Sequence, residues 1–140
     1  LINEMVKLQQ FTVVHAPSMA QRAALEGLRN PESKKFIEDM VREYDRRRRF
    51  MVENLNKIYG FKVKPPKGAF YVFANVKELG MTSTDLAELI LSEAGVITVP
   101  GSAFGPNGEG YLRFCYATSI SQIELGIKRI EGVIKKIKGL

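Results

Sequence analysis

Hydrophobic side chains recur at the 3.6-residue period of a helix in three long stretches of this chain. These stretches cover residues 17–28, residues 30–58 and an isoleucine-rich segment over residues 120–137. At 1.5 Å per residue, the second stretch predicts a helix roughly 40 Å long, which exceeds most helices inside single domains. We therefore expect it to link two structural units.

Short apolar runs bounded by Gly and Pro lie between the last two long helices and predict strands. They cover residues 61–63, 69–76, 96–99 and 111–117. A shorter helix is expected after Thr82, which forms a capping box with Asp85, and Gly95 should end it.

The residues after Tyr59 therefore predict an α/β fold of the two-layer α+β kind. Two helices should cover one face of a small, mostly antiparallel sheet, preceded by the long linking helix.

Composition places the chain among globular proteins. It has 140 residues, of which 45% are hydrophobic and 26% charged. No apolar run approaches the ~20 residues of a membrane helix, and residues 1–10 do not resemble a signal peptide, so we expect no membrane association and a cytoplasmic location. The single cysteine, Cys115, lies between Phe114 and Tyr116 and is predicted to be a buried, unreactive thiol. One cysteine with one histidine predicts no metal site.

The net charge of +6 would suit an anionic partner such as a nucleic acid. The basic residues are scattered, however, apart from the run 46–49 and the lysines near the C-terminus. Consecutive helical residues point about 100° apart, so the arginine run cannot form one stripe. We expect both groups to be mainly solvated faces, and nucleic-acid binding to be unlikely.

Arg113 is the most informative single residue. It interrupts the apolar run 111–117, and a guanidinium removed from water needs an anionic partner. Its planar donors match a carboxylate, so an arginine on a strand beside the glycine-rich loop 101–110 is suited to bind a substrate carboxylate. From composition alone, an internal salt bridge to one of the fifteen Asp and Glu residues is the favoured interpretation.

Other candidate chemistry is weaker. The loop 99–105 lacks the endings of a P-loop or dinucleotide motif, so turn formation is favoured. His15 has no acid or nucleophile at a recognisable spacing, which favours capping or loop packing. The lysines Lys62, Lys64 and Lys67 flank a Pro-Pro turn and should be solvated, whereas a catalytic lysine needs desolvation or a cationic neighbour.

Four strings in order resemble the closing third of class I/II aminotransferases of the aspartate-aminotransferase type, which are pyridoxal-phosphate (PLP) enzymes of fold type I. They are PSMAQRAAL at 17–25, PKGAFY at 66–71, GVITVPGSAFG at 95–105 and GYLRFCYA at 110–117. The resemblance covers essentially the whole chain. It implies residues 1–30 as the end of a large cofactor domain, 31–58 as an interdomain helix and 59–140 as the C-terminal small domain.

On this resemblance, Arg113 matches the arginine that binds the substrate α-carboxylate, which reverses the interpretation from composition. Gly68 and Phe70 match a turn that in this family moves as the small domain closes. Thr12 and His15 lie in a segment that resembles one approaching the neighbouring subunit's active site in the family's homodimers, although the arginine of dicarboxylate-selective relatives is absent from residues 11–17.

The family mechanism needs a lysine that holds PLP and an aspartate at its pyridine nitrogen. The resemblance implies that both lie N-terminal to Leu1, in a missing portion of the same enzyme. We therefore expect a fragment of an enzyme that transfers an amino group between an amino acid and a 2-oxo acid. The chain alone should bind no cofactor and be inactive.

Two alternatives remain open at this point. Lyases and synthases of the same PLP superfamily share this C-terminal pattern. From a different class, the chain would be a self-standing basic module whose residues 46–49 contact phosphates, with an affinity that falls steeply with salt.

Overall fold

The computed structural model describes residues 1–139 and divides into two compact units, Leu1–Met40 and Val41–Leu140. The first unit contains helices α1 (Ile2–Thr12) and α2 (Ser18–Arg29) and the beginning of α3 (Pro31–Leu55). No residue of α1 or α2 is buried. The helix predicted over residues 17–28 is thus confirmed, but its apolar side has no partner within this unit.

Helix α3 ends at Leu55, three residues before the predicted end at Ile58. The next residue, Asn56, turns its side chain to strand β1 instead of continuing the helix. Its amide nitrogen donates to the Val63 carbonyl at 3.0 Å, and its amide oxygen accepts from the Val63 N–H at 2.8 Å. These two bonds satisfy the backbone N–H and carbonyl groups of Val63 on the edge strand β1. They explain why helix α3 ends before Ile58.

Four antiparallel strands form one sheet in the order β1-β2-β4-β3. The strands are β1 (Lys62–Val63), β2 (Tyr71–Asn75), β3 (Val99–Pro100) and β4 (Tyr111–Cys115). Strands β1, β2 and β4 lie inside predicted apolar runs and are shorter than those runs, whereas β3 extends one residue past its predicted run, to Pro100. The strand expected over residues 96–99 is the largest difference, because only its last residue pairs with β4, and Ile97 is 82% exposed.

The shorter helices follow the predicted capping signals. Helix α4 (Ser83–Leu89) begins after Thr82, whose hydroxyl oxygen accepts the Asp85 N–H at 3.1 Å. A π-helical turn, η2 (Ile90–Ala94), continues it to Gly95, which has a φ of +63° and ends it as predicted. Three short 3₁₀ turns, η1 (Lys77–Leu79), η3 (Gly101–Phe104) and η4 (Pro106–Gly108), complete the connections.

The C-terminal helix α5 (Ile120–Lys138) starts after Ser119, whose hydroxyl oxygen accepts the Gln122 N–H at 3.3 Å. The middle of its isoleucine stripe is buried as predicted, but Ile137 at the end is 38% exposed. No helix among residues 1–139 is both long and apolar enough to cross a bilayer.

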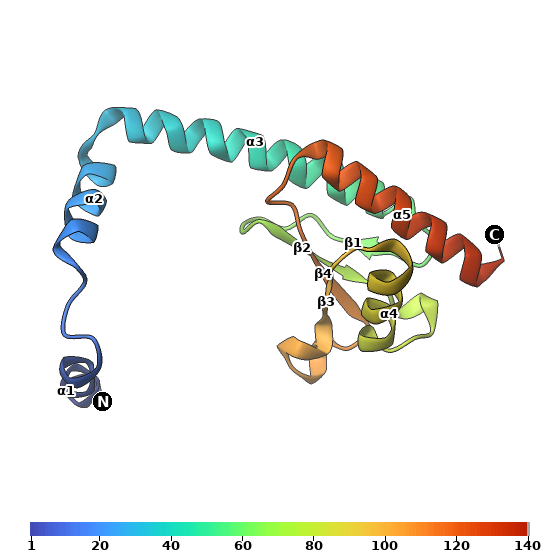
Figure 1. Cartoon of the computed structure of the whole chain (residues 1–140), viewed down its shortest axis with the longest axis horizontal. Coiled ribbons are helices and arrows are strands. Elements are labelled where there is room, and N and C mark those ends of the chain that lie inside the picture. Colours follow the sequence, from blue (N-terminus) through green and yellow to red (C-terminus); the bar gives the residue numbers. More distant parts are fainter. Residues whose placement is uncertain (140) are drawn as a thin grey trace. The chain divides into compact units, whose positions relative to one another are not determined.

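Helices α4 and α5 cover one face of the sheet, as the sequence predicts, and the end of α3 joins the same core (Figure 1). The most deeply buried side chains come from every layer: Leu55, Val72, Leu86, Ile90, Leu112, Ile130 and Ile134. Because side chains alternate along a strand, the residues between these buried positions point to the opposite face of the sheet. That opposite face, called the open face below, holds the candidate site.

Candidate functional site

The open face is formed by alternate residues of the two central strands. In β2 and β4 the buried positions alternate with exposed or half-buried ones, and Phe73 lies opposite Arg113 in register. Phe104, from η3, packs against the same region. The side chains on this face are Tyr71, Phe73, Asn75, Tyr111, Arg113 and Cys115.

Arg113 lies between two aromatic rings. Its Cζ atom is 5.1 Å from the centre of the Tyr71 ring and 5.0 Å from that of Phe104. Both distances are typical of cation–π contacts. No carboxylate among residues 1–139 forms an ion pair with it, so the internal salt bridge favoured by composition is absent from this part of the chain.

The aromatic residues around Arg113 also contact one another. The rings of Phe73 and Tyr111 stack at 4.9 Å and nearly parallel, with 5° between their planes, while Phe104 meets Phe73 edge-on at 5.9 Å. The Lys77 ammonium lies 5.3 Å from the Tyr111 ring. Arg113 therefore contacts a continuous aromatic surface on two central strands, which is a rigid support for a recognition group.

The loop 101–110 is fixed by close packing and by hydrogen bonds to Ser83. A Cβ on Gly101 would overlap the carbonyl group of Gly108, so the backbones approach as only glycine allows. The Glu109 carboxylate accepts the Ser83 N–H at 2.7 Å and the Ser83 hydroxyl at 2.8 Å. The bond from the Ser83 N–H is the main cause that lowers the pKa of Glu109.

The turn before β2 contains the candidates Gly68 and Phe70. Gly68 has no positive φ, and a Cβ there would meet no atom within 4 Å. The strained residue is its neighbour Ala69, at a φ of +63°. Phe70 is 51% exposed, and its ring meets the Tyr71 ring edge-on, with 5.4 Å between the ring centres. Because the Tyr71 ring in turn contacts Arg113, the turn is connected to the arginine through Tyr71.

The other two candidates, Thr12 and His15, lie in the first unit and are exposed. The Thr12 hydroxyl donates to the carbonyl oxygen of Leu8 at 3.1 Å. The Nδ1 atom of His15 lies 3.0 Å from the Ala16 carbonyl oxygen, in keeping with the loop-packing role favoured from the sequence.

Cys115 contradicts its sequence interpretation. It is exposed, not buried, because it occupies an open-face position of β4. Apolar residues on both faces of β4 concealed this alternation.

Among the described residues, no three His, Cys, Asp or Glu side chains gather as a metal site.

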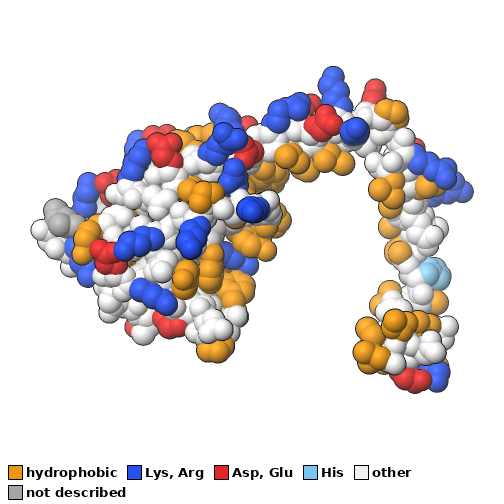
Figure 2. All heavy atoms as spheres, turned by 180° about the vertical axis from the view of Figure 1, so that it is seen from behind, with side chains coloured by type: hydrophobic (Ala, Val, Ile, Leu, Met, Phe, Trp, Pro, Cys, Tyr) orange, Lys and Arg blue, Asp and Glu red, His pale blue; other side chains and the backbone are white. Residues whose placement is uncertain are grey.

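The arginine run is only partly a solvated face. Arg46 and Arg49 are well exposed, but the side chains of Arg47 and Arg48 are each 23% exposed. All four pair with Glu43 or Asp45, and hydrogen bonds from Arg46 and Arg47 lower the pKa of Glu43 to about 2. On the larger unit, Figure 2 shows basic and acidic side chains interspersed.

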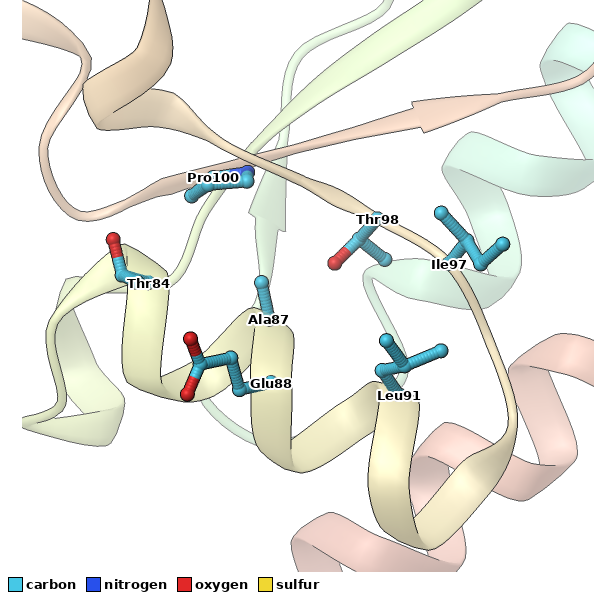
Figure 3. Close-up of a pocket in the computed structure, with 7 residues that line it drawn as sticks. All are labelled: Thr84, Ala87, Glu88, Leu91, Ile97, Thr98 and Pro100. Atoms are coloured by element: carbon cyan, nitrogen blue, oxygen red, sulfur yellow. The ribbon is translucent and has the colours of Figure 1, made fainter.

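A hollow of about 230 Å³ lies between α4 and the segment leading into β3 (Figure 3). Thr84, Glu88, Leu91 and Ile97 contribute to its lining, and the buried Thr98 hydroxyl has no hydrogen-bond partner among the described residues. Val99 is the register partner of Arg113, so by alternation Thr98 points to the opposite face. The hollow is therefore separate from the open face.

The sequence profile of the family described as "Aminotransferase class I and II" matches residues 1–130. The chain belongs to this family. The aspartate aminotransferase of Pyrococcus horikoshii is 44% identical over 135 residues, which are 96% of this chain and 34% of that protein. This chain thus spans about a third of the length of that curated aminotransferase.

Solved aminotransferase structures share the fold. The crystal structure of an aromatic aminotransferase from Pyrococcus horikoshii gives a TM-score of 0.93 at 42% identity, covering 99% of this chain and 37% of the other. The structure of the Thermus thermophilus aspartate aminotransferase with maleate gives a TM-score of 0.84 at 34% identity, covering 94% of this chain and 34% of the other. The chain corresponds to the C-terminal part of such aminotransferases.

Sequence reasoning identified Arg113 but not the groups that hold it. No contact of Tyr71 or Phe104 with Arg113 was predicted, and the Ser83–Glu109 bonds join positions 26 residues apart. Strand alternation around Arg113 would have indicated Tyr111 and Cys115 on its face. No local signal indicated the partner of Ser83.

Proposed function

We propose that this chain is the substrate-recognition part of a PLP-dependent aminotransferase, and that Arg113 binds the α-carboxylate of the amino acid and of the 2-oxo acid. The observation that supports this most is the setting of Arg113 on a central strand, between two aromatic rings and without a carboxylate partner among residues 1–139.

The geometry suits that role chemically. None of the described residues accepts a hydrogen bond from the Arg113 guanidinium, so its N–H groups can donate to a ligand. A carboxylate can then accept two parallel hydrogen bonds from one arginine. Because β4 is paired on both sides, by β2 and β3, the backbone of Arg113 is held at a fixed position. The relative crystallised with maleate, a dicarboxylate, supports a carboxylate ligand.

The exposure of the lysines in this chain argues against a PLP site within it. PLP is held in such enzymes by a lysine whose activation needs desolvation or a cationic neighbour. Every lysine of the chain lies among the described residues and is exposed. The residues present therefore do not fit the cofactor site. We propose that PLP is held by the rest of the enzyme and that the isolated chain is inactive.

This proposal assigns a role to each segment of the chain. Residues 1–30 would complete the cofactor domain, residues 31–58 would connect the domains and residues 59–140 would form the small domain. The turn with Gly68 and Phe70 would move on closure, and in a homodimer Thr12 and His15 would face the neighbouring active site.

Other reactions remain as alternatives. A PLP-dependent lyase or synthase would use the same carboxylate contact, and substrate tests on the complete enzyme would separate them. Nucleic-acid binding is less favoured, because the arginines at 46–49 are already paired with Glu43 and Asp45. Binding of a DNA oligonucleotide that falls steeply with salt would revive it.

The test uses a chimeric enzyme in which this chain replaces the region it matches in the Pyrococcus horikoshii aspartate aminotransferase. Arg113→Lys keeps the charge but removes bidentate binding, so KM for amino acid and 2-oxo acid should rise about 100-fold, equivalent to about 2.7 kcal/mol. The control Arg129→Lys, at an exposed position on α5, should leave KM unchanged. Equal KM values for both variants would contradict the proposal.

A second experiment tests the cofactor part. The isolated chain is incubated with PLP, reduced with borohydride and analysed by mass spectrometry. We expect no adduct, or sparse labelling spread over many exposed lysines. A stoichiometric adduct on one lysine would mean that the chain holds its own cofactor site.

A further inference from the structure

The turn that leads into β2 contains a strained residue. Ala69 has a φ of +63°, in the left-handed region that side chains other than glycine rarely adopt. Gly68, immediately before it, does not use that region. Such strain persists only where the surrounding structure imposes it.

Tyr116 imposes it from the core. Its hydroxyl donates to the Ala69 carbonyl oxygen at 2.8 Å, and its backbone N–H donates to the Phe70 carbonyl oxygen at 2.9 Å. Tyr116 is only 1% exposed, and burial raises the pKa of its hydroxyl, which therefore stays a donor. One buried residue thus fixes two consecutive carbonyl groups of the turn.

Helix α3 holds the start of the same turn. Arg48 donates from Nη1 to the Pro66 carbonyl oxygen at 3.1 Å, while its Nη2 bonds Asp45. The Tyr44 ring lies 6.2 Å from that of Tyr116, which packs the hydroxyl-bearing ring against the helix. The turn is therefore fixed at Pro66 by α3 and near its end by Tyr116, the residue directly after β4.

The turn determines where the next side chain lies. Tyr71 follows directly, pairs with Cys115 in register and places its ring 5.1 Å from the Arg113 Cζ atom. A different backbone conformation at Ala69 would redirect the chain entering β2 and move the Tyr71 ring.

We propose that Tyr116 is a positioning residue for the carboxylate site. Its hydroxyl holds Ala69 in the left-handed conformation and thereby keeps the Tyr71 ring against Arg113. This inference rests on the proposed function of Arg113.

The chimeric enzyme again provides the test. Tyr116→Phe removes only the hydroxyl and should raise KM for the amino acid about fivefold while kcat changes less than twofold, because the loss concerns placement of the carboxylate contact. Tyr59→Phe, which removes the hydroxyl of a tyrosine that is 48% exposed, is the matched control and should change neither value.

Ala69 variants test the physical cause. Glycine adopts a positive φ without strain, so Ala69→Gly should reduce the effect of Tyr116→Phe on KM to less than twofold. Ala69→Val increases the strain at an exposed position and should raise KM even with Tyr116 present. This variant also provides the test if Tyr116→Phe does not fold.

The outcomes separate the two proposals. If Arg113→Lys raises KM but Tyr116→Phe behaves like Tyr59→Phe, the positioning role is wrong and the proposed function stands. A fall in kcat at constant KM, or no rescue by Ala69→Gly, also overturns the positioning role. If Arg113→Lys leaves KM unchanged, the proposed function fails and this inference fails with it.

Discussion

The carboxylate of Glu109 accepts two hydrogen bonds from Ser83, one from its backbone N–H at 2.7 Å and one from its hydroxyl at 2.8 Å. Ser83 is fully buried at the first turn of α4, and Glu109 lies near the end of the loop 101–110, which contains Phe104. The loop beside Arg113 is therefore attached to the helix on the other side of the sheet through the Glu109 carboxylate, and Ser102 adds a second attachment by donating its N–H to the Ser83 hydroxyl oxygen at 3.3 Å.

This attachment predicts a pH-dependent stability. Because the pKa of Glu109 is lowered in the folded chain, its contribution is complete above the ordinary value of 4.5 and is lost as the pH falls through the lower folded value. The difference in urea-unfolding free energy between the chain and Glu109→Gln should be largest near neutral pH and shrink below about 4.5. Glu124→Gln, which removes an exposed ion pair on α5, should show little difference at any pH. If the difference in unfolding free energy between the chain and Glu109→Gln does not change with pH, the account is contradicted.

Close backbone packing predicts an unequal response of two glycines. Gly101→Ala forces a methyl group into the Gly108 carbonyl and should cost about 3 kcal/mol of unfolding free energy. Gly68→Ala meets open space at an ordinary φ and should change it by less than about 0.5 kcal/mol. Denaturant unfolding monitored by circular dichroism measures both. Equal costs would mean that loop 101–110 is not packed as described.

Burial predicts how one of the five tyrosines ionises. Desolvation raises the pKa of Tyr116, so in the folded chain its phenolate should form above the usual range. Stability from this group is complete below the ordinary value of 10.0 and is lost as the pH rises through the folded value. Absorbance titration near 295 nm should show a late step that Tyr116→Phe removes. A late step that persists in the variant would assign it to another tyrosine.

The absence of buried residues in α1 and α2 predicts low protection in the first unit. Short helices without tertiary contacts are marginal in water, so their amides should exchange with deuterium within seconds in the isolated chain. The amides of β2, β4 and α5 should exchange far more slowly. Exposed apolar side chains such as Phe11 and Leu28 should also favour self-association, and light scattering that gives a clean monomer would contradict this second expectation.

Local chemistry in the sequence predicted the elements well. Capping residues at Thr82 and Ser119 and the glycine at 95 marked helix ends that the structure confirms. The end of α3 was missed because it depends on Asn56 bonding Val63, a contact that periodicity does not reveal.

The candidate site was only partly predictable, for a physical reason. Arg113 was recognisable as a cation in an apolar strand, but its neighbours on both faces of β4 are apolar, so the strand was interpreted as one buried run and the alternation around Arg113 was not used. Cys115 was consequently assigned to the wrong face. The bonds from Tyr116 to Ala69 and from Ser83 to Glu109 join distant positions, and no local pattern predicts such pairs.

The most direct test of the central claim is a crystal structure of the chimeric enzyme with bound maleate. The account predicts a carboxylate that accepts two hydrogen bonds of about 2.7–2.9 Å from the Arg113 guanidinium, with the Tyr71 and Phe104 rings still in contact with it. Maleate bound elsewhere, with Arg113 contacting only its aromatic neighbours, would contradict the account.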